Sequence, residues 1–261
     1  MSIVRLQGVS LTIGVTPILR DVDLDLAEGE CLGIAGPNGV GKTTLLMVLA
    51  TLQSPTGGTG SVLGAVLGTP EITTVRREIG LSGHAPALYD DLTLAENLLH
   101  VARLADVDSK EVSRTLAEVG LEAAADRRAV DCSEGMRRRA DLARLLLTRP
   151  RLVLLDEAHA GLDADARVIV DEVGRRVLAR GGAFVTVSHD PAALGRQARR
   201  WALPSRRGSS VQAQSPRKSV PHLFVGASGS VQLTRATGLL YCPRSRGRRR
   251  MRRGTFASSR N

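Results

Sequence analysis

The stretch "GPNGVGKTT", residues 36–44, decides the fold of this 261-residue chain. It matches the pattern G-x-x-x-x-G-K-[ST], in which glycines let successive backbone N–H groups turn inward toward phosphate oxygens. The apolar run "CLGIAG" ends in its first glycine, and "KTTLLMVLATL" continues from its lysine with helical periodicity. A buried strand, a glycine-rich loop and a helix in this order predict a site that binds nucleotide phosphates at the helix N-terminus.

Two side chains of this loop have expected roles of their own. Lys42 is expected to reach the β- and γ-phosphates, and the hydroxyl of Thr43 is expected to bind Mg²⁺. The alternative is a glycine-rich turn with a lysine by chance, but the chain has three lysines against 33 arginines, which makes chance a poor explanation. We therefore predict that the nucleotide is bound by Gly36, Pro37, Asn38, Gly39, Val40, Gly41, Lys42, Thr43 and Thr44.

Acidic residues at the end of a second apolar run predict the catalytic half of the site. "LVLLDEA" indicates a buried strand whose carboxyl end carries Asp156 and Glu157. Asp156 is expected to hold Mg²⁺, and Glu157 is expected to orient and deprotonate the attacking water. His189, in "TVSHD" at the end of another apolar run, could hydrogen-bond the γ-phosphate and help to hold the water. The alternatives are two solvated acids at a strand end and a structural histidine.

The rest of the pattern predicts an α/β fold. Residues 2–30 alternate apolar and polar side chains, which indicates a small antiparallel N-terminal sheet. The apolar runs "CLGIAG", "RLVLLDEA" and "AFVTVSHD" alternate with helical patterns, which argues for a mostly parallel sheet covered by helices.

Helix-start signals divide the middle of the chain. Two helices are predicted between residues 93 and 120, because Thr93 with Glu96 and Asp108 with Glu111 have the spacing of capping boxes. A third helix is expected to start near Ser133 and to continue through "RRADLARLLL".

Composition is typical of a soluble globular protein, with 43% hydrophobic and 24% charged residues. No apolar run approaches the roughly 20 residues needed to span a bilayer, and because no charged segment followed by an apolar run opens the sequence, we expect no signal peptide. The three cysteines are widely spaced, which suggests neither a disulfide framework nor a zinc site. We expect a cytoplasmic protein whose membrane role, if it has one, depends on a separate membrane partner.

The C-terminal part differs sharply in charge from the rest. Residues 204–261 contain twelve arginines, one lysine and no acidic residue, so the other residues carry a net charge of −3 within the total of +10. This tail has no sustained periodicity, which predicts a disordered basic segment. It could contact nucleic acid or anionic lipid by charge alone, or it could be an extension without a specific role or a frame-shifted end. We expect no specific nucleic-acid partner.

These motifs, in this order, resemble the nucleotide-binding subunit of ABC transporters over about residues 3–201. "CSEGMRRRADLARLLLTRPRLVLLDEA" is similar to the family's signature loop and helix running into Walker B. "AGLDADAR" resembles its D-loop, with Asp163 in the family position, and "LTLAENL" resembles the start of its helical subdomain. The resemblance implies a P-loop NTPase core in an ATPase domain of residues 1–203, with an inserted helical subdomain at about residues 84–140.

The resemblance also implies partners and an activity. In this family two subunits pack head to tail, so Ser133 and Gly135 of one subunit would contact the γ-phosphate that the other binds. The expected activity is ATP hydrolysis with Mg²⁺, in a homo- or heterodimer. The dimer would lie at the inner face of the cell membrane, held there by transmembrane permease subunits.

Several residues depart from the family pattern. The usual signature Leu-Ser-Gly-Gly-Gln is here "CSEGM", and Glu134 would bring negative charge near ATP unless it points away. Ala158 stands where the family has a proline after the Walker B glutamate. No aromatic residue lies near Ile13, so the adenine base would rest on aliphatic surface.

His84, in "LSGHAPALYDDLT", occupies the place of the family's Q-loop glutamine. Imidazole can accept or donate a hydrogen bond as glutamine does, so His84 is a candidate nucleotide-site residue, with a spacer role as the alternative. The Gly-His pair followed by Pro and "LT" resembles the haem-exporter ATPase of cytochrome c maturation. "YDDLT" and "SEGMRRR" equally resemble ATPases of drug and polysaccharide exporters.

The hypothesis favoured by these resemblances is the ATPase of an exporter, with haem as one candidate substrate. Two alternatives remain open. One is a non-transport ABC-type ATPase that acts on nucleic acid through the basic tail. The other is a degenerate protein that binds ATP without hydrolysing it.

Overall fold

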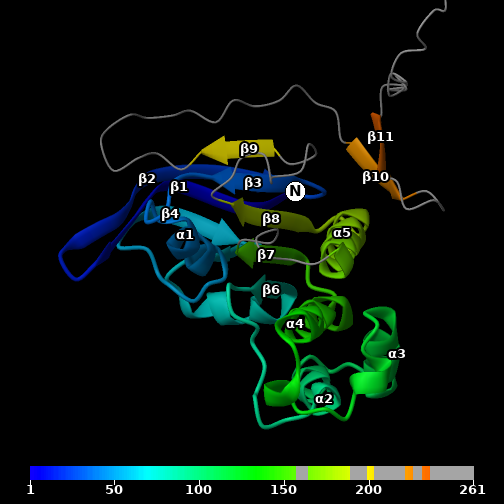
Figure 1. Cartoon of the computed structure of the whole chain (residues 1–261). Coiled ribbons are helices and arrows are strands. Elements are labelled where there is room, and N and C mark those ends of the chain that lie inside the picture. The colour runs from blue at the N-terminus through cyan, green and yellow to red at the C-terminus, as the bar shows by residue number, and fades with distance from the viewer. Residues whose placement is uncertain (157–163, 189–198, 203–220, 226–230, 236–261) are drawn as a thin grey trace, which may run out of the picture. The chain divides into compact units, whose positions relative to one another are not determined.

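A five-stranded sheet forms the centre of the fold, in the order β6-β7-β8-β3-β9 (Figure 1). The computed structural model describes residues 1–156, 164–188, 199–202, 221–225 and 231–235. All four neighbouring pairs in this sheet are parallel, which confirms the predicted parallel sheet. The strands are β3 (Cys31–Ala35), β6 (Ile79–Ser82), β7 (Leu152–Asp156), β8 (Ala183–Ser188) and β9 (Arg199–Ala202).

A second sheet is antiparallel and contains the N-terminal strands, as their alternating pattern predicts. Its order is β2-β1-β4-β5, and its strands are β1 (Ser2–Ile13), β2 (Thr16–Ala27), β4 (Gly57–Val62) and β5 (Ala65–Val66). Leu6, Val9 and Leu11 of β1 are almost completely buried. They belong to the same apolar core as Leu32 of β3 and Leu45 of the first helix, so the two sheets share one core.

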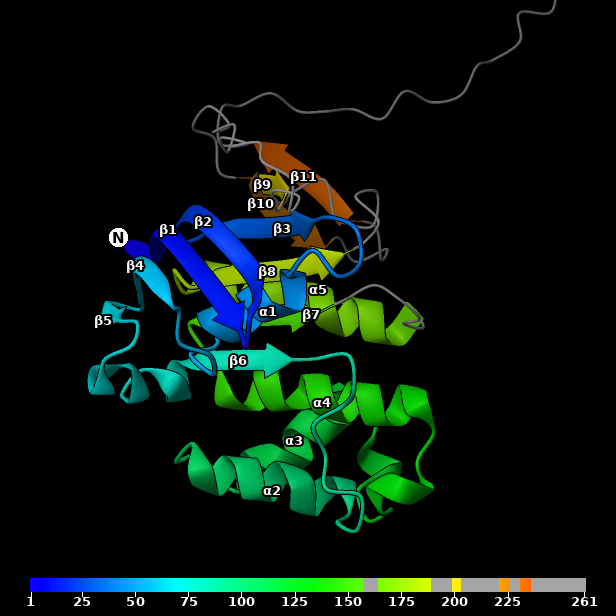
Figure 2. The same ribbon diagram turned by 90° about the vertical axis from the view of Figure 1, so that its left-hand side faces the viewer.

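Five α-helices complete the described part of the larger unit. They are α1 (Lys42–Leu49), α2 (Leu94–Leu104), α3 (Lys110–Glu118), α4 (Glu134–Thr148) and α5 (Ala164–Ala179). Short 3₁₀ turns are η1 (Pro70–Thr73), η2 (Arg76–Glu78), η3 (Glu122–Ala124) and η4 (Ala129–Asp131). Helices α2, α3 and α4 are inserted between β6 and β7 in the chain, and α2 and α3 lie beyond α4 from the sheet (Figure 2).

The two predicted capping boxes have different outcomes. Thr93 caps α2 as predicted, because its hydroxyl accepts from the Glu96 backbone and the Glu96 carboxylate accepts from the Thr93 backbone. These bonds lower the pKa of Glu96. The box predicted for Asp108 and Glu111 is wrong, because Ser109 is the N-cap residue of α3 and makes no side-chain cap bond.

The physical reason lies in the partners that these two acids find instead. The Asp108 carboxylate accepts from the Lys110 backbone only two residues along, which closes a tight turn in place of a cap. The Glu111 carboxylate forms ion pairs with Arg114 and with Arg149, so it does not fold back onto the chain before the helix.

The parallel sheet separates two apolar cores, because successive side chains of a strand point to opposite faces. Leu152 and Leu154 of β7 pack into the core shared with α1 and the antiparallel sheet. Val153 and Leu155 of the same strand pack into a second core built with helices α2 to α5. Strand β7 is therefore buried on both faces, which fits its continuous apolar sequence.

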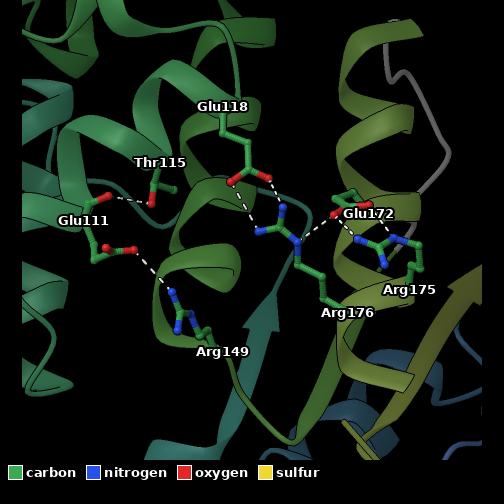
Figure 3. A network of polar contacts seen from close by, with 7 residues as sticks. All are labelled: Glu111, Thr115, Glu118, Arg149, Glu172, Arg175 and Arg176. Carbon is green, nitrogen blue, oxygen red and sulfur yellow. Dashed lines mark hydrogen bonds and ion pairs between the residues drawn. The ribbon is translucent and has the colours of Figure 1, made fainter. Parts of the chain in front are cut away.

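Ion pairs connect α3 to α5 at the edge of this second core (Figure 3). Arg176 donates to both carboxylate oxygens of Glu118 and, through Nε, to Glu172 Oε1 at 2.6 Å. Arg175 Nε donates to Glu172 Oε2 at 2.7 Å. We call Glu118, Glu172, Arg175 and Arg176 the α3–α5 network; its side chains are 25% to 42% exposed.

A second, smaller unit begins at Ser219, and the predicted boundary of the ATPase domain at residue 203 stays a prediction. Strands β10 (Pro221–Val225) and β11 (Val231–Arg235) form an antiparallel pair within it. The expected absence of regular structure in the tail therefore does not hold for these ten residues, and for the rest of residues 204–261 it stays a prediction. No helix in the described ranges is long and apolar enough to cross a membrane.

Candidate functional site

The phosphate-binding loop leaves the carboxyl end of β3 and ends at the first residues of α1, as the sequence predicts. Gly41 is the N-cap of α1 and has a φ of 110°, which side-chain-bearing residues rarely adopt. A Cβ at Gly41 would lie 3.0 Å from Leu19 Cδ2 and 3.1 Å from the carbonyl oxygen of Ile18. This position therefore requires glycine both for its backbone conformation and for its close approach to β2.

The N-terminus of α1 is arranged to receive an anion. No side chain caps it, and its first turn contains no acidic residue. The first N–H groups of a helix lack partners within the helix and carry its positive partial charge. Phosphate oxygens are suitable acceptors for such groups, and the loop of residues 36–44 leads directly into them.

Lys42 supplies a positive charge at the same place. Its side chain is 7% exposed, and its Nζ donates to the carbonyl oxygens of Gly36 at 2.8 Å and Pro37 at 3.0 Å. The ammonium group is therefore folded back over the loop that it belongs to. Both bonds are to neutral carbonyl groups, so an anionic phosphate would be a stronger partner for this cation.

Thr43 and Asp156 meet directly, although 113 positions separate them in the chain. The Thr43 hydroxyl donates to Asp156 Oδ2 at 2.7 Å, and Asp156 is 8% exposed at the carboxyl end of β7. Helix α1 packs against β7, which brings the two residues together across the intervening strand β8. The structure thus joins the two residues that the sequence assigns to one metal ion.

The chemistry of these donors fits a nucleotide with a hard divalent cation. Hydroxyl and carboxylate oxygens are the ligands that Mg²⁺ prefers, and Thr43 and Asp156 place one of each at hydrogen-bonding distance. Lys42 is the first residue of α1, so its charge and the N-terminus of the helix lie at the same end of the loop. Together they offer hydrogen-bond donors and a positive charge for phosphate groups, and oxygen ligands for a cation.

Two predicted catalytic residues and one residue of the D-loop lie outside the described residues. These are Glu157, His189 and, in the D-loop, Asp163. Glu157 follows Asp156 directly, and His189 follows the last residue of β8. Their roles as base, γ-phosphate contact and D-loop acid therefore stay predictions.

Ser133 and Gly135 lie at the start of α4, where the helix was predicted to begin. Ser133 is the N-cap residue, and its hydroxyl accepts from the Met136 backbone at 3.3 Å. Ser133 and Glu134 are both exposed. In the part of the chain that is described, no hydrogen bond joins Ser133 to the phosphate-binding loop, and the predicted contact of Ser133 and Gly135 with a nucleotide bound by another subunit stays a prediction.

The charge near Ser133 depends partly on its neighbour Cys132. Partial burial raises the pKa of the Cys132 thiol, and nearby Arg127 opposes this effect. The thiol is therefore protonated at neutral pH and adds no negative charge beside Ser133. The only acid beside the serine on the α4 side is Glu134, whose effect on ATP affinity stays a prediction.

His84 lies in the loop after β6, at the same sheet edge as the phosphate-binding loop and Asp156. Strand β6 pairs in parallel with β7, so the carboxyl ends of both strands face the same way. His84 is exposed, and its carbonyl oxygen accepts from Arg138 Nη1 at 3.4 Å. Its predicted role toward nucleotide stays a prediction.

Three residues of α4 that hold this loop are not among the residues predicted from the sequence. They are Arg138, Asp141 and Arg144, which follow one another at intervals of three positions. A signal was present, because Asp141 stands among the apolar residues of "RRADLARLLL". An acid at a core-facing helix position is seldom buried unless it is paired.

Ile13 lies at the end of β1 and is 51% exposed. Val15, in the turn to β2, is 96% exposed. The described surface near the expected adenine position is therefore aliphatic, as the sequence predicts. Its effect on nucleotide affinity stays a prediction.

Comparison with known families gives one match across the centre of the chain. The family model described as ABC transporter matches residues 19–160, which include the phosphate-binding loop, α4 and Asp156. The Nod factor export ATP-binding protein I of Rhizobium johnstonii is 35% identical over 190 residues. This stretch covers 71% of the chain and 61% of that protein, so the chain matches under two thirds of the length of these relatives.

An importer protein has a similar level of identity. The sn-glycerol-3-phosphate import ATP-binding protein UgpC 1 of Rhizobium johnstonii is 34% identical over 195 residues, which cover 73% of the chain and 52% of that protein. Identity to these two proteins therefore does not separate export from import.

Two solved structures have the same fold over most of the chain. An ATP-binding subunit of an ABC transporter superposes with a TM-score of 0.70 and 27% identity, covering 77% of this chain and 85% of that one. A dimeric ATP-binding cassette in a post-hydrolysis state, bound to ADP and Pi, superposes with a TM-score of 0.67 and 26% identity. The second match covers 79% of this chain and 100% of that one.

Proposed function

The chain belongs to the ABC transporter family as an ATP-binding domain, and on this premise we propose that it binds and hydrolyses ATP to drive a membrane transporter. One observation carries the proposal more than any other. The Thr43 hydroxyl and the Asp156 carboxylate meet at 2.7 Å beside the loop that holds Lys42. Three residues from two distant segments thus converge on one phosphate and cation site.

The chain's own residues divide the work of hydrolysis. The α1 N-terminus and Lys42 bind the phosphates and offset the charge that develops on them. Thr43 and Asp156 would hold Mg²⁺, which would supply further positive charge to offset that of the phosphates. Glu157 orients the attacking water and accepts its proton, and His189 helps to hold that water in line.

A second subunit completes the site. Ser133 is exposed and is joined only to its own helix among the described contacts, so it is available to a nucleotide held by another copy. Gly135 lies in the first turn of the same helix, next to Ser133 and Glu134. The dimeric cassette that shares this fold supports a dimer, and we leave open whether the second subunit is identical.

For the transport direction we propose export. The Nod factor export proteins support this direction, and the UgpC 1 importer is the observation against it. Among exporters, "YDDLT" and "SEGMRRR" favour a drug or polysaccharide type. The haem alternative rests on the Gly-His pair followed by Pro and "LT", and neither relative named above has haem in its name. Permease subunits would place the protein at the inner face of the cell membrane.

The test of hydrolysis is the substitution Glu157→Gln. We expect turnover to fall by at least about 100-fold while ATP binding persists, because the change removes the base and keeps the shape. ATP should then stabilise a dimer of the variant. Glu71→Gln, an exposed acid in η1, is the matched control and should hydrolyse ATP at the parental rate. Parental turnover by Glu157→Gln would contradict the assignment of the base.

The test of transport is purification from membranes under mild detergent. Recovery of the chain with a multi-span membrane protein would support a transporter subunit. Recovery with RNA that is released by salt would support the nucleic-acid alternative instead. The gene next to this one offers an independent check, because a cytochrome c maturation cluster would favour haem and an unrelated permease would exclude it.

A further inference from the structure

Asp141 is a completely buried acid in the middle of α4, with 0% of its surface exposed. Its neighbours Ala140, Leu142 and Ala143 are buried apolar residues. A charge in such a place is costly unless it is paired and hydrogen-bonded. The hydrogen-bond partners of this carboxylate therefore offset the cost of burying it in the helix.

The carboxylate joins both ends of the loop that contains His84. Ser82, the last residue of β6, donates its hydroxyl to Asp141 Oδ2 at 2.5 Å. The backbone N–H of Ala87 donates to Oδ1 at 3.0 Å. Residues 83–86 are thus closed into a short loop whose two ends are bound to one side chain.

Two arginines of the same helix strengthen this attachment. Arg144 donates to Asp141 Oδ1 through Nε, at 3.0 Å, and through Nη2. The same Nη2 also donates to the carbonyl oxygen of Leu81 at 3.4 Å. Arg138 Nη1 donates to the carbonyl oxygens of Gly83 at 2.5 Å and His84 at 3.4 Å. The loop from the end of β6 to residue 87 is therefore attached to α4 by several hydrogen bonds.

The same helix begins at Ser133, the residue that faces the second subunit in the proposed function. Ser133 precedes Asp141 by eight residues, or about 12 Å along the helix axis. Ser133 and the residues that bind the loop therefore belong to one continuous helix, so the position of the helix determines the positions of both. Asp141 is the residue of this helix that binds both ends of the loop.

We propose that Asp141 is a positioning residue, which fixes the His84 loop to α4 so that the loop takes its place only when Ser133 does. The inference rests on the proposed function, because it gives the loop a task in ATP hydrolysis. Apolar packing alone could hold α4 on the sheet, and replacing a buried ion by apolar residues often leaves stability unchanged. A carboxylate with partners at both loop ends gives instead one defined loop geometry.

The experiment compares Asp141→Asn with the parental protein. The amide keeps the size of the side chain but removes its charge and turns one acceptor into a donor facing Ser82 or Ala87. We expect amide hydrogen exchange of residues 83–87 to rise by about 10-fold, while exchange in β7 is unchanged. We expect kcat for ATP to fall by about 10-fold with KM changed by less than about 3-fold, because nucleotide binding itself is spared.

A double-substitution cycle separates positioning from a loss of stability. In a His84→Ala background, Asp141→Asn should lower kcat by less than about 2-fold, since the group that it positions is gone. Ser82→Ala is a milder variant that removes a single bond, and it should have the same pattern with a smaller effect. Thr115→Val, which removes a buried hydrogen bond within α3, is the control and should leave exchange of residues 83–87 unchanged.

Two results would overturn the proposal. One is a folded Asp141→Asn protein whose loop exchanges at the parental rate. The other is an equal loss of kcat in both His84 backgrounds, which would make Asp141 merely structural. Failure of the proposed function would look different, because the parental protein itself would then hydrolyse no ATP.

Discussion

The phosphate site and the α3–α5 network use the same kinds of groups in different surroundings. At the phosphate site, Lys42 and Asp156 are 7% and 8% exposed, and neither forms an ion pair with a charged side chain among the described contacts. In the α3–α5 network the four side chains are 25% to 42% exposed and paired with opposite charges. Charges that already have partners hold elements together, whereas buried charges bound only by neutral groups are ready for a charged ligand.

The strongest test of this comparison is Lys42→Ala. It removes the cation that is bound only by the carbonyls of Gly36 and Pro37, so ATP hydrolysis should fall by at least about 100-fold. The thermal midpoint without ligand should change little, because no ion pair is broken. Steady-state ATPase assays and thermal unfolding with and without MgATP give both quantities.

Lys110→Ala is the matched control for this prediction, since Lys110 is exposed at the start of α3. It should leave ATPase activity at the parental level. If Lys42→Ala retained activity while Lys110→Ala lost it, the phosphate site would be misplaced.

The next effect in size is expected for Thr43→Val, which keeps the side-chain shape and removes the hydroxyl. Asp156 then loses its donor at 2.7 Å, which should cost about 1 kcal/mol of unfolding free energy. Hydrolysis should fall by about 10-fold or more and should require a higher Mg²⁺ concentration, because one cation ligand is missing. A Mg²⁺ titration of the ATPase rate measures this shift.

Thr59→Val, an exposed threonine in β4, is the control for the loss of a hydroxyl. Its Mg²⁺ dependence should match that of the parental protein. An unchanged Mg²⁺ dependence in Thr43→Val would remove Thr43 from the cation site.

The phosphate site could be predicted from sequence because its chemistry is local. The glycines, Lys42 and Thr43 lie within nine positions, and a single strand end supplies Asp156. The hydrogen bonds of Asp141 with Ser82 and Ala87 could not be predicted in this way. They depend on how α4 packs against a loop that lies 54 to 59 positions earlier in the sequence. A buried acid signals that a partner exists, but it does not identify that partner.

Short elements show the same limit. Strand β6 has only four residues, which is too short a stretch for its alternation to identify it, and its pairing with β7 defines it as a strand. The predicted cap of α3 is wrong because Glu111 pairs with Arg114 on the same helix and with Arg149 at the end of α4. The cap of α2 was predicted correctly because both of its partners, Thr93 and Glu96, lie within the same turn.

Ser133→Ala tests whether an exposed polar group gains a role in a dimer. As an N-cap residue, Ser133 should contribute about 1 kcal/mol to unfolding free energy. Thr93→Ala removes the corresponding cap of α2 and should cost a similar amount. Only Ser133→Ala should also lower ATPase activity, by about 10-fold, because only Ser133 would face a nucleotide in the second subunit. Equal ATPase rates in the two variants would leave Ser133 a cap alone.

The smallest effect is expected in the α3–α5 network itself, with Glu172→Gln. Hydrogen bonds from Arg175, and with them those from Arg176, lower the pKa of Glu172 below its ordinary value of 4.5, against an opposing effect of burial. A carboxylate whose folded pKa is lowered stabilises the fold above its unfolded pKa, and this stabilisation is lost as pH falls through the folded pKa. The parental protein should therefore exceed Glu172→Gln in unfolding free energy at pH 7, by about 1 kcal/mol or less for such partly exposed pairs. The difference should shrink below pH 4.5 and in about 1 M salt, which screens the pairs.

Denaturant unfolding at several pH values measures this difference in unfolding free energy, with Glu71→Gln as the exposed control. A difference that grew on acidification, or that survived high salt, would contradict stabilisation by the Glu172 charge, and the contrast between the two sites would then rest on burial alone.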